Sequence, residues 1–382
     1  MNHCALTNFL ALLALLLAAP AESREIPADG WEKEVIAEDL EHPWSMAWLD
    51  EERMLVTERA GRLRLIHRQE GLRAEPVAGV PEAHVRDQAG LFEVLPDPEF
   101  ANSGKIWLSL ANGDARANTT AVYRARLEGQ RLEDVTRVFR AEPERATSVH
   151  YGGRMEWLPD GTLLIALGDG FNYREDAQRL DRHTGSIVRI HPDGGIPDDN
   201  PFVDEPDARD EIYSYGHRNV QGLVFDRDRE ILWQHEHGPR GGDEFHRIRP
   251  GTNYGWPVVT RGRDYSGARI TPFRSHREVE LPHASPDSDP LHHWTPAIAP
   301  AGMSLYTGDR FDGWQGDLLI AGLVDRAVRR LELDDAGGIV AEHRLFEKLD
   351  RRIRDVRSGP EGAVYLLTDH ADGELLRMTP AE

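Results

Sequence analysis

One phrase recurs six times along the chain and constrains the fold more than any other feature. The phrase is a short apolar run, a turn rich in Pro, Asp, Glu or Gly, and then further apolar runs. Its six copies begin near Met46, Leu91, Met155, Leu223, Met303 and Val356. Runs such as residues 162–167 (TLLIAL) are short and bounded by Gly, Asp or Pro, which favours β-strands over helices.

Further strand-like runs follow the copies, so each unit has the strand content of a four-stranded blade. A ring of such blades is one way in which an all-β protein protects its sheet edges. We therefore predict an all-β fold, a six-bladed β-propeller in which residues 22–382 form a single domain. Residues 31–40 are expected to add a strand that completes the last blade. A β-sandwich, or two unrelated β domains, is the alternative.

The units are longer than compact propeller repeats, roughly sixty residues against about 40–50. The surplus lies in the loops between units three, four and five. Because loops on a rigid scaffold commonly carry binding and catalytic residues, we expect function there.

The N-terminus has the pattern of a secretory signal peptide. Residues 9–19 are apolar and end near Ala19-Pro20-Ala21, a small-residue cleavage site, so we predict a signal peptide over residues 1–21 and a periplasmic or secreted protein. The run is too short to span a bilayer. No Lys or Arg precedes it, and a buried N-terminal helix is the alternative. The single cysteine, Cys4, falls inside this segment, which excludes a catalytic cysteine in the mature chain.

The charge of the chain narrows the range of partners. A formal net charge of −21 repels nucleic acid and anionic membranes, so neither nucleic-acid binding nor stable membrane insertion is expected. Small neutral or cationic substrates are compatible with it.

His150 is the most plausible base in the chain, because a histidine titrates near neutral pH. It stands in residues 149–154 (VHYGGR), immediately before a predicted strand. Asp169 ends the next strand of the same blade and could orient the imidazole ring. A structural histidine and a simple turn aspartate are the alternatives.

Two later segments also carry polar residues that folding does not require. Arg218 and Asn219 meet at a loop-to-strand junction, where Arg218 suits a carboxylate or a developing oxyanion, or forms an inter-blade salt bridge. Residues 235–244 (HEHGPRGGDE) make a turn whose carbonyl and carboxylate oxygens suit calcium. Zinc bound through His235 and His237 is the alternative there.

These motifs belong to a set of nine that together resemble one known family. They are HPW at 42–44, the stretch around Gln88, VHYGGR at 149–154, LGD at 167–169, YSYGHRN at 213–219, HEHGPRGGDE at 235–244, NYGWP at 253–257, IAPAGM at 298–303 and RIRDVR at 352–357. In order and approximate spacing they resemble the soluble aldose sugar dehydrogenases of the glucose/sorbosone dehydrogenase family. The resemblance extends from about Val35 to Pro380.

The resemblance implies an enzyme that oxidises aldose sugars with pyrroloquinoline quinone (PQQ) and Ca²⁺, and passes electrons to an artificial or respiratory acceptor. It makes His150 the general base, Asp169 its support, and Arg218 a catalytic contact to the quinone. The implied cofactor-binding residues are Gln88, His150, Arg218, Asn219, Tyr265, Arg352 and Arg354. The implied calcium ligands are the carbonyls of Gly238 and Pro239 at the cofactor, with Glu244 and Tyr254 at a second, structural ion.

Some positions depart from the family pattern. Val324 stands where the family commonly has a cofactor-contacting Lys, and Arg326 is a possible substitute. Residues 87–90 read DQAG instead of GQGG, Ala301 replaces a Ser, and Ser186 stands where a Lys is frequent. Two other functions remain open: a non-catalytic, calcium-stabilised propeller that binds carbohydrate or protein, and a calcium-dependent, lactonase-like hydrolase.

Overall fold

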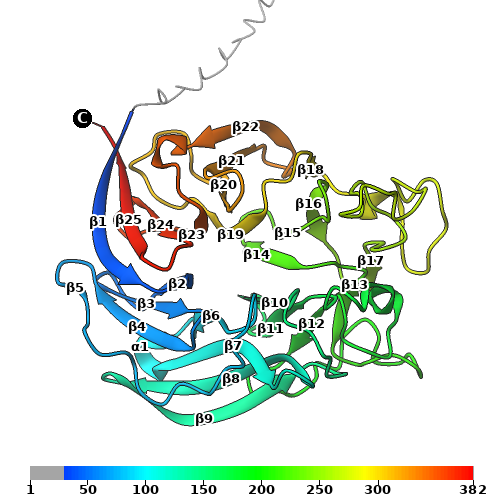
Figure 1. Ribbon diagram of the computed structural model, residues 1–382, viewed down its shortest axis with the longest axis horizontal. Coiled ribbons are helices and arrows are strands. Elements are labelled where there is room, and N and C mark those ends of the chain that lie inside the picture. The colour runs from blue at the N-terminus through cyan, green and yellow to red at the C-terminus, as the bar shows by residue number, and fades with distance from the viewer. Residues whose placement is uncertain (1–29, 382) are drawn as a thin grey trace, which may run out of the picture.

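The computed structural model describes residues 30–381. Six β-sheets are arranged around a common centre like the blades of a propeller (Figure 1), so the predicted six-bladed β-propeller is confirmed. The predicted signal peptide, residues 1–21 with Cys4, lies outside the described residues and stays a prediction.

Each blade is built from strands that follow one another in the chain, with two exceptions noted below. The first three blades are β2 (Pro43–Trp48), β3 (Arg53–Glu58), β4 (Arg62–His67) and β5 (Gly71–Leu72); β6 (Leu91–Pro96), β7 (Lys105–Gly113), β8 (Asn118–Glu128) and β9 (Arg131–Arg140); and β10 (Gly152–Trp157), β11 (Leu163–Leu167), β12 (Ser186–Ile190), β13 (Ile212–Tyr215) and β17 (Thr252–Asn253). The other three are β14 (Val220–Asp226), β15 (Ile231–Glu236), β16 (Asp243–Ile248) and β18 (His292–Trp294); β19 (Pro300–Leu305), β20 (Leu318–Gly322), β21 (Val328–Leu333) and β22 (Ile339–Leu345); and β23 (Ile353–Ser358), β24 (Val364–Thr368), β25 (Gly373–Pro380) and β1 (Trp31–Leu40).

The two exceptions tie distant parts of the chain together. β1 pairs antiparallel with β25, from Trp31 opposite Pro380 to Leu40 opposite Gly373, so the strand predicted over residues 31–40 completes the last blade as expected. In Figure 1 the blue β1 lies beside the red β25. β17 follows the fourth blade's β16 in sequence but pairs in parallel with β13 of the third blade. These strands therefore link the ends of the chain and the third and fourth blades.

The hydrophobic core lies between the blades. Six clusters of buried apolar side chains each join two neighbouring blades, and every one of the six junctions has its own cluster. The innermost strands β2, β6, β10, β14, β19 and β23 contact one another in a closed ring. Each of the six predicted repeat starts falls within one of these innermost strands. The second strands β11 and β20 are buried along their whole length, which explains why their sequences are continuously apolar.

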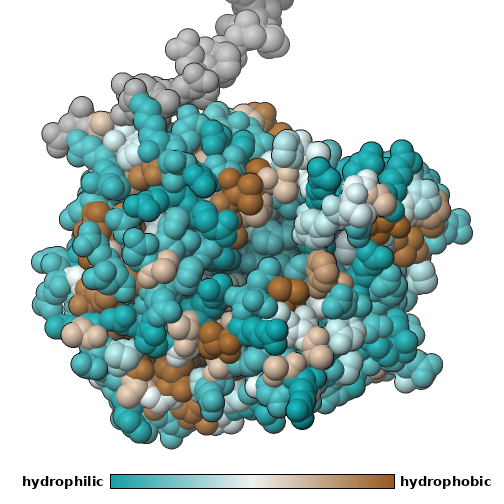
Figure 2. Space-filling model, in the orientation of Figure 1, coloured by the Kyte–Doolittle hydropathy of each residue, from teal (hydrophilic) through white to brown (hydrophobic). Residues whose placement is uncertain are grey.

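Helices contribute little to the part of the chain that the structure describes. They are α1 (Phe100–Ser103), η1 (Arg174–Gln178), η2 (Pro286–Ser288) and η3 (Glu347–Leu349). Within residues 30–381, no helix has the length and apolar character needed to cross a membrane. The face seen in Figure 2 is mostly hydrophilic and is hollowed near the centre of the ring.

Candidate functional site

Most of the predicted site residues, though not Glu244, Tyr254 and Tyr265, lie at or beside two recurrent positions of the blades. One is the loop that leads into the innermost strand, and the other is the end of the second strand. Because these strands run antiparallel, the start of one and the end of the other meet at the same sheet edge. In the third blade, His150 precedes β10 and Asp169 follows β11. Motifs that are spread over the whole chain are thereby brought to one end of the ring.

A cavity of about 310 Å³ lies among these loops, and all six blades contribute to it. The expectation that mainly the long loops between units three and five carry the site is therefore too narrow. Predicted residues that line this first cavity are Gln88, Asn219, Arg352 and Arg354; Trp44, Arg59, Phe92, His237, Val324 and Asp369 line it as well. Its volume is within the range of small-molecule sites, roughly 300–1,000 Å³.

The first cavity is electropositive. Nη2 of Arg352 and Nη2 of Arg354 lie 2.8 and 2.9 Å from the same oxygen, Oδ2 of Asp369. Burial opposes ionisation of Asp369, but the two arginines outweigh it and hold the pKa of this carboxyl far below its usual value. Burial lowers the pKa of His237 to about 3, so this ring is neutral. Because Arg59 is the third arginine and Asp369 the only carboxylate of the lining, two positive charges are uncompensated.

His150 and Asp169 form the predicted pair, with Nδ1 of His150 2.7 Å from Oδ1 of Asp169. Both side chains are buried. A Cβ on Gly168 would lie 2.0 Å from the carbonyl oxygen of His150, so a glycine is needed for this close approach. The backbone N–H of His150 donates to Oε1 of Gln88 at 2.9 Å, and its φ of 57° is in the left-handed region. Such strained conformations of non-glycine residues cluster at functional sites.

Three donors converge on the carboxylate of Asp169. Besides His150, the backbone N–H of Phe171 and Nε1 of Trp256 donate to it at 2.7 and 2.8 Å. Burial opposes the ionisation of Asp169, but the hydrogen bond and charge of His150 and the charge of Arg218 lower its pKa. An ionised Asp169 can only accept, so Nδ1 of His150 carries a proton and Nε2 is left as the basic nitrogen.

The pKa of His150 results from opposing effects. Burial lowers it, the hydrogen bond to Asp169 raises it, and the positive charges of Arg218 and Arg145 lower it further. The net direction is downward, so the imidazole is neutral, and therefore able to accept a proton, at neutral pH.

Arg218 and Asn219 lie beside this pair. Nη1 of Arg218 donates to the carbonyl oxygens of His237 and Gly238 at 2.9 and 2.8 Å. Nδ2 of Asn219 lies 3.4 Å from Nδ1 of His237. The carbonyls of this turn therefore already converge on one cationic group, which is the donor set that a hard cation such as Ca²⁺ prefers. Pro239, the next predicted ligand, lines a second cavity.

The second cavity, also about 310 Å³, is lined by Asp169 of the His150 pair, while Tyr151 and Gly152, which follow His150, line the first. Tyr265 and Arg218 line this second cavity, whereas Gln88, Asn219, Arg352 and Arg354 line the first. Phe171 contacts the ring of His150 edge-on with ring centroids 5.2 Å apart, and Tyr265 lies 6.2 Å from Phe171. Both aromatic rings are exposed, at 42% and 58%. The cavity therefore presents an apolar surface next to the basic histidine.

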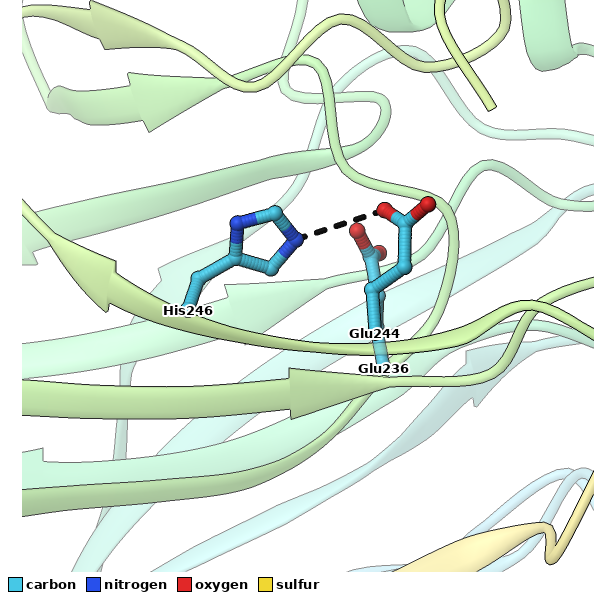
Figure 3. A group of neighbouring side chains, drawn as sticks. All are labelled: Glu236, Glu244 and His246. Carbon is cyan, nitrogen blue, oxygen red and sulfur yellow. Dashed lines mark hydrogen bonds and ion pairs between the residues drawn. The ribbon is translucent and has the colours of Figure 1, made fainter. Parts of the chain in front are cut away.

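Glu244 belongs to a separate, buried group that also contains Glu236 and His246 (Figure 3). Their ligating atoms all lie within 4.8 Å of one another, and Nε2 of His246 is 3.3 Å from Oε2 of Glu244. Burial raises the pKa of Glu236 to about 7. Tyr254 packs edge-on against His246 with centroids 5.1 Å apart. The hydroxyl of Tyr254 already bonds the backbone of Arg247 and Arg249, so only its carbonyl is available to a metal.

The zinc alternative for the same segment is not supported by the geometry. Neither His235 nor His237 belongs to the possible metal-binding group found among residues 30–381; Glu236, between them, does. His235 is fully buried against Gly222, and Nε2 of His237 donates to the carbonyl of Pro300 at 2.8 Å.

The departures from the family pattern have identifiable surroundings. Val324 lines the first cavity and is 60% exposed. Arg326, the suggested substitute for a lysine at 324, instead pairs with Asp350 at 2.8 Å and does not line the cavity. Asp87 accepts a hydrogen bond from Ser148 at 2.6 Å, and the adjacent Gln88 still faces the cavity. The structure gives no explanation for Ser186.

Comparisons with known proteins agree with this architecture. Residues 40–377 match the model of the glucose/sorbosone dehydrogenase family. The chain is 40% identical to aldose sugar dehydrogenase YliI of Escherichia coli, over 98% of both chains. The apo-form structure of the soluble aldose sugar dehydrogenase from Escherichia coli covers 92% of this chain and 99% of its own, with a TM-score of 0.85. The PQQ-bound aldose sugar dehydrogenase from Streptomyces coelicolor, 25% identical, covers 92% of this chain and 99% of its own with a TM-score of 0.72.

The fold and the matching family model together define one class of protein, the dehydrogenases built on a six-bladed propeller. The chain belongs to the glucose/sorbosone dehydrogenase family.

Several residues of the site were not predicted from the sequence. Arg59 and Phe171 had no motif of their own, and Trp256 was noted only as part of NYGWP. Glu236 was overlooked between two histidines, although a glutamate at the end of an apolar strand was a usable signal. His246 lies two residues after Glu244 on β16, so strand alternation places both on one face.

Proposed function

We propose that the chain is an aldose dehydrogenase that oxidises the anomeric carbon of a sugar to a lactone, with PQQ as hydride acceptor and Ca²⁺ as the bound metal. The observation that carries the proposal is the His150–Asp169 pair beside a cavity with two uncompensated positive charges. Membership of the family, the name of the Escherichia coli relative and the PQQ-bound Streptomyces structure support the same activity.

His150 is the general base in this proposal. Oxidation of an anomeric CH–OH group removes a proton from the oxygen and a hydride from the carbon. Nε2 of His150 takes the proton, because Nδ1 is committed to Asp169. Asp169 fixes the ring and stabilises the imidazolium that forms. Phe171, edge-on to His150, provides an apolar surface for the sugar ring in the second cavity.

The residues of the first cavity fit PQQ, which is a flat tricarboxylate. Arg352 and Arg354 supply guanidinium groups for carboxylates, and Nε of Arg354 is buried without a hydrogen-bond partner. Gln88 and Asn219, from the second and fourth blades, line the same cavity and offer amides. When bound, PQQ supplies the hydride acceptor, and Ca²⁺ acts as a Lewis acid on its reactive carbonyl.

The carbonyl oxygens of Gly238 and Pro239 would hold the calcium ion of the reaction site. The convergence of the neighbouring carbonyls on the guanidinium of Arg218 supports a cation there. A second ion, bound by Glu244 and the carbonyl of Tyr254 and assisted by Glu236, would be structural. Burial raises the pKa of Glu236, and a cation bound beside this carboxyl would favour its ionised form and so lower the pKa again.

The lactonase-like hydrolase fits the site less well. Such an enzyme needs carboxylates that are free to bind a central metal, and the only carboxylate of the first cavity, Asp369, is bonded to two arginines. We also propose, from the predicted signal peptide, that the enzyme works in the periplasm or outside the cell, with an artificial or respiratory electron acceptor.

The test is dye-linked oxidation of aldoses by the purified mature protein, with PQQ and Ca²⁺ added separately and together. His150→Ala is compared with His191→Ala, since His191 is an exposed histidine outside both cavities. Activity that needs both additions, survives in the His191 variant and falls at least about 100-fold in the His150 variant supports the proposal. No oxidation and no retention of PQQ on gel filtration would refute it in favour of a binding propeller.

A further inference from the structure

Among the described residues, Arg59 is the one arginine of the first cavity whose side chain forms no hydrogen bond or ion pair. It directly follows β3 of the first blade, the place that Asp369 takes after β24 in the sixth. Its side chain is half-buried and lines the cavity. A partly buried guanidinium is normally paired with an anion, so its isolation calls for a ligand.

The backbone of Arg59 is fixed on both sides. Its N–H donates to the carbonyl of His42 at 3.1 Å, and its own carbonyl accepts from the N–H of Leu91 at 3.2 Å. A Cβ on Gly90 would lie 2.0 Å from that carbonyl, so a glycine is needed for the two blades to meet here. These bonds set the direction from which the side chain reaches the cavity without using the guanidinium itself.

The carboxylates around Arg59 are already engaged. The adjacent Glu58 is fully buried and accepts from the backbone of Glu41 and from Nε of Arg62, both at 2.6 Å. Asp369, in the same cavity, is held by Arg352 and Arg354. The pKa of Glu41 is lowered mainly by Arg62, which is bonded to that carboxylate at 2.7 Å, and to a lesser extent by the charge of Arg59. Among the described residues, no carboxylate therefore lies within ion-pair distance of Arg59.

We propose that Arg59 binds a carboxylate of the cofactor and, with Arg352 and Arg354, forms a two-sided clamp for an anionic ligand. The inference rests on the proposed function, which identifies the ligand as the tricarboxylate PQQ. The clamp comes from two adjacent blades, the first and the sixth. On the fifth blade the exposed Val324 offers no charge, so the arginines of the lining that suit carboxylates lie on the first and sixth blades.

The test is equilibrium binding of PQQ in the presence of Ca²⁺, measured by quenching of tryptophan fluorescence, which needs no turnover. Arg59→Met is compared with Arg59→Lys and with Arg116→Met. Arg116 is an exposed arginine between β7 and β8, the corresponding loop of the second blade, and serves as the matched control. Thermal unfolding without PQQ checks that each variant is folded, and each is also titrated with the trimethyl ester of PQQ.

We expect Arg59→Met to raise the Kd for PQQ about 10- to 100-fold, the effect of losing one charge-assisted hydrogen bond. Arg59→Lys should lose less, and Arg116→Met should bind like the wild type. The ratio of Kd between Arg59→Met and the wild type should be smaller for the trimethyl ester, whose carboxylates are neutralised. It should also be smaller at higher salt concentration. Equal binding by the Arg59 and Arg116 variants would refute the clamp alone, whereas a wild type that does not bind PQQ would refute both the clamp and the proposed function.

Discussion

Replacing Asp169 by Asn changes the proposed base without changing its size. In the wild type, the carboxylate accepts the proton on Nδ1 of His150 at 2.7 Å and leaves Nε2 basic. An asparagine side chain can instead donate its amide N–H to Nδ1, and this stabilises the tautomer in which Nε2 carries the proton and cannot act as a base. The variant should therefore bind sugar and cofactor but transfer the proton poorly.

The size of the effect follows from the geometry. General-base catalysis contributes about 10²–10⁴-fold, so kcat/KM should fall by about that factor, or roughly 3–5 kcal/mol. The pKa of His150 is lowered by burial and raised by Asp169, so activity in the wild type should rise as the pH passes through a value below the usual 6.5. An opposite charge this close typically shifts a pKa by about 1–3 units. Loss of the Asp169 charge should lower the pKa of His150. Activity of Asp169→Asn should therefore begin to rise at a lower pH than activity of the wild type.

The assay is dye-linked oxidation between pH 4 and 9 at saturating PQQ and Ca²⁺. Asp198→Asn is the control, because Asp198 is exposed and lies outside both cavities. A variant that loads PQQ normally but keeps the rate and pH profile of the wild type would contradict the role of Asp169. An acid limb that moves to higher pH would also contradict it.

Three further predictions concern the support of the site. Gly168→Ala places a Cβ 2.0 Å from the carbonyl of His150, so it should cost about 1–3 kcal/mol of stability in urea unfolding and lower kcat. Asp369→Asn leaves the partly buried Arg354 without its counter-charge, and the free energy of unfolding should fall by about 1–3 kcal/mol. Removal of Ca²⁺ should lower the Tm of the wild type, and Glu244→Gln should make this difference smaller in calorimetry.

The sequence predicted the inner part of each blade better than the outer part. A second strand such as β11, residues 163–167, is buried along its whole length and is continuously apolar. The outermost strand β22 (Ile339–Leu345) is only partly buried and reads as a mixed sequence, and β5 has two residues. Neither strand has an alternation of apolar and polar residues, or a β propensity, that distinguishes it from a loop.

Contacts within a blade were also easier to predict than contacts between loops. His150 and Asp169 were expected to meet because they occupy the facing ends of two antiparallel strands, and they do. Tyr265, a predicted cofactor contact, lines the second cavity from the long segment between β17 and β18, whose path no strand register determines. Strand pairing fixes the relative positions of residues that are close in sequence, whereas a long loop does not.

The position of Arg59 shows how repetition can supply what motifs do not. In the sequence, Arg59 is one of 45 lysine and arginine residues and stands in a loop without a recognisable motif. In the ring it takes the same place after the second strand that Asp369 takes in the sixth blade. Because all blades direct this position toward one end of the ring, any charged residue found there is a candidate for ligand contact, whatever its sequence context. The charges of the first cavity therefore have two sources: the motif at 352–357, which supplies Arg352 and Arg354, and the repeated position after the second strand, which supplies Arg59 and Asp369.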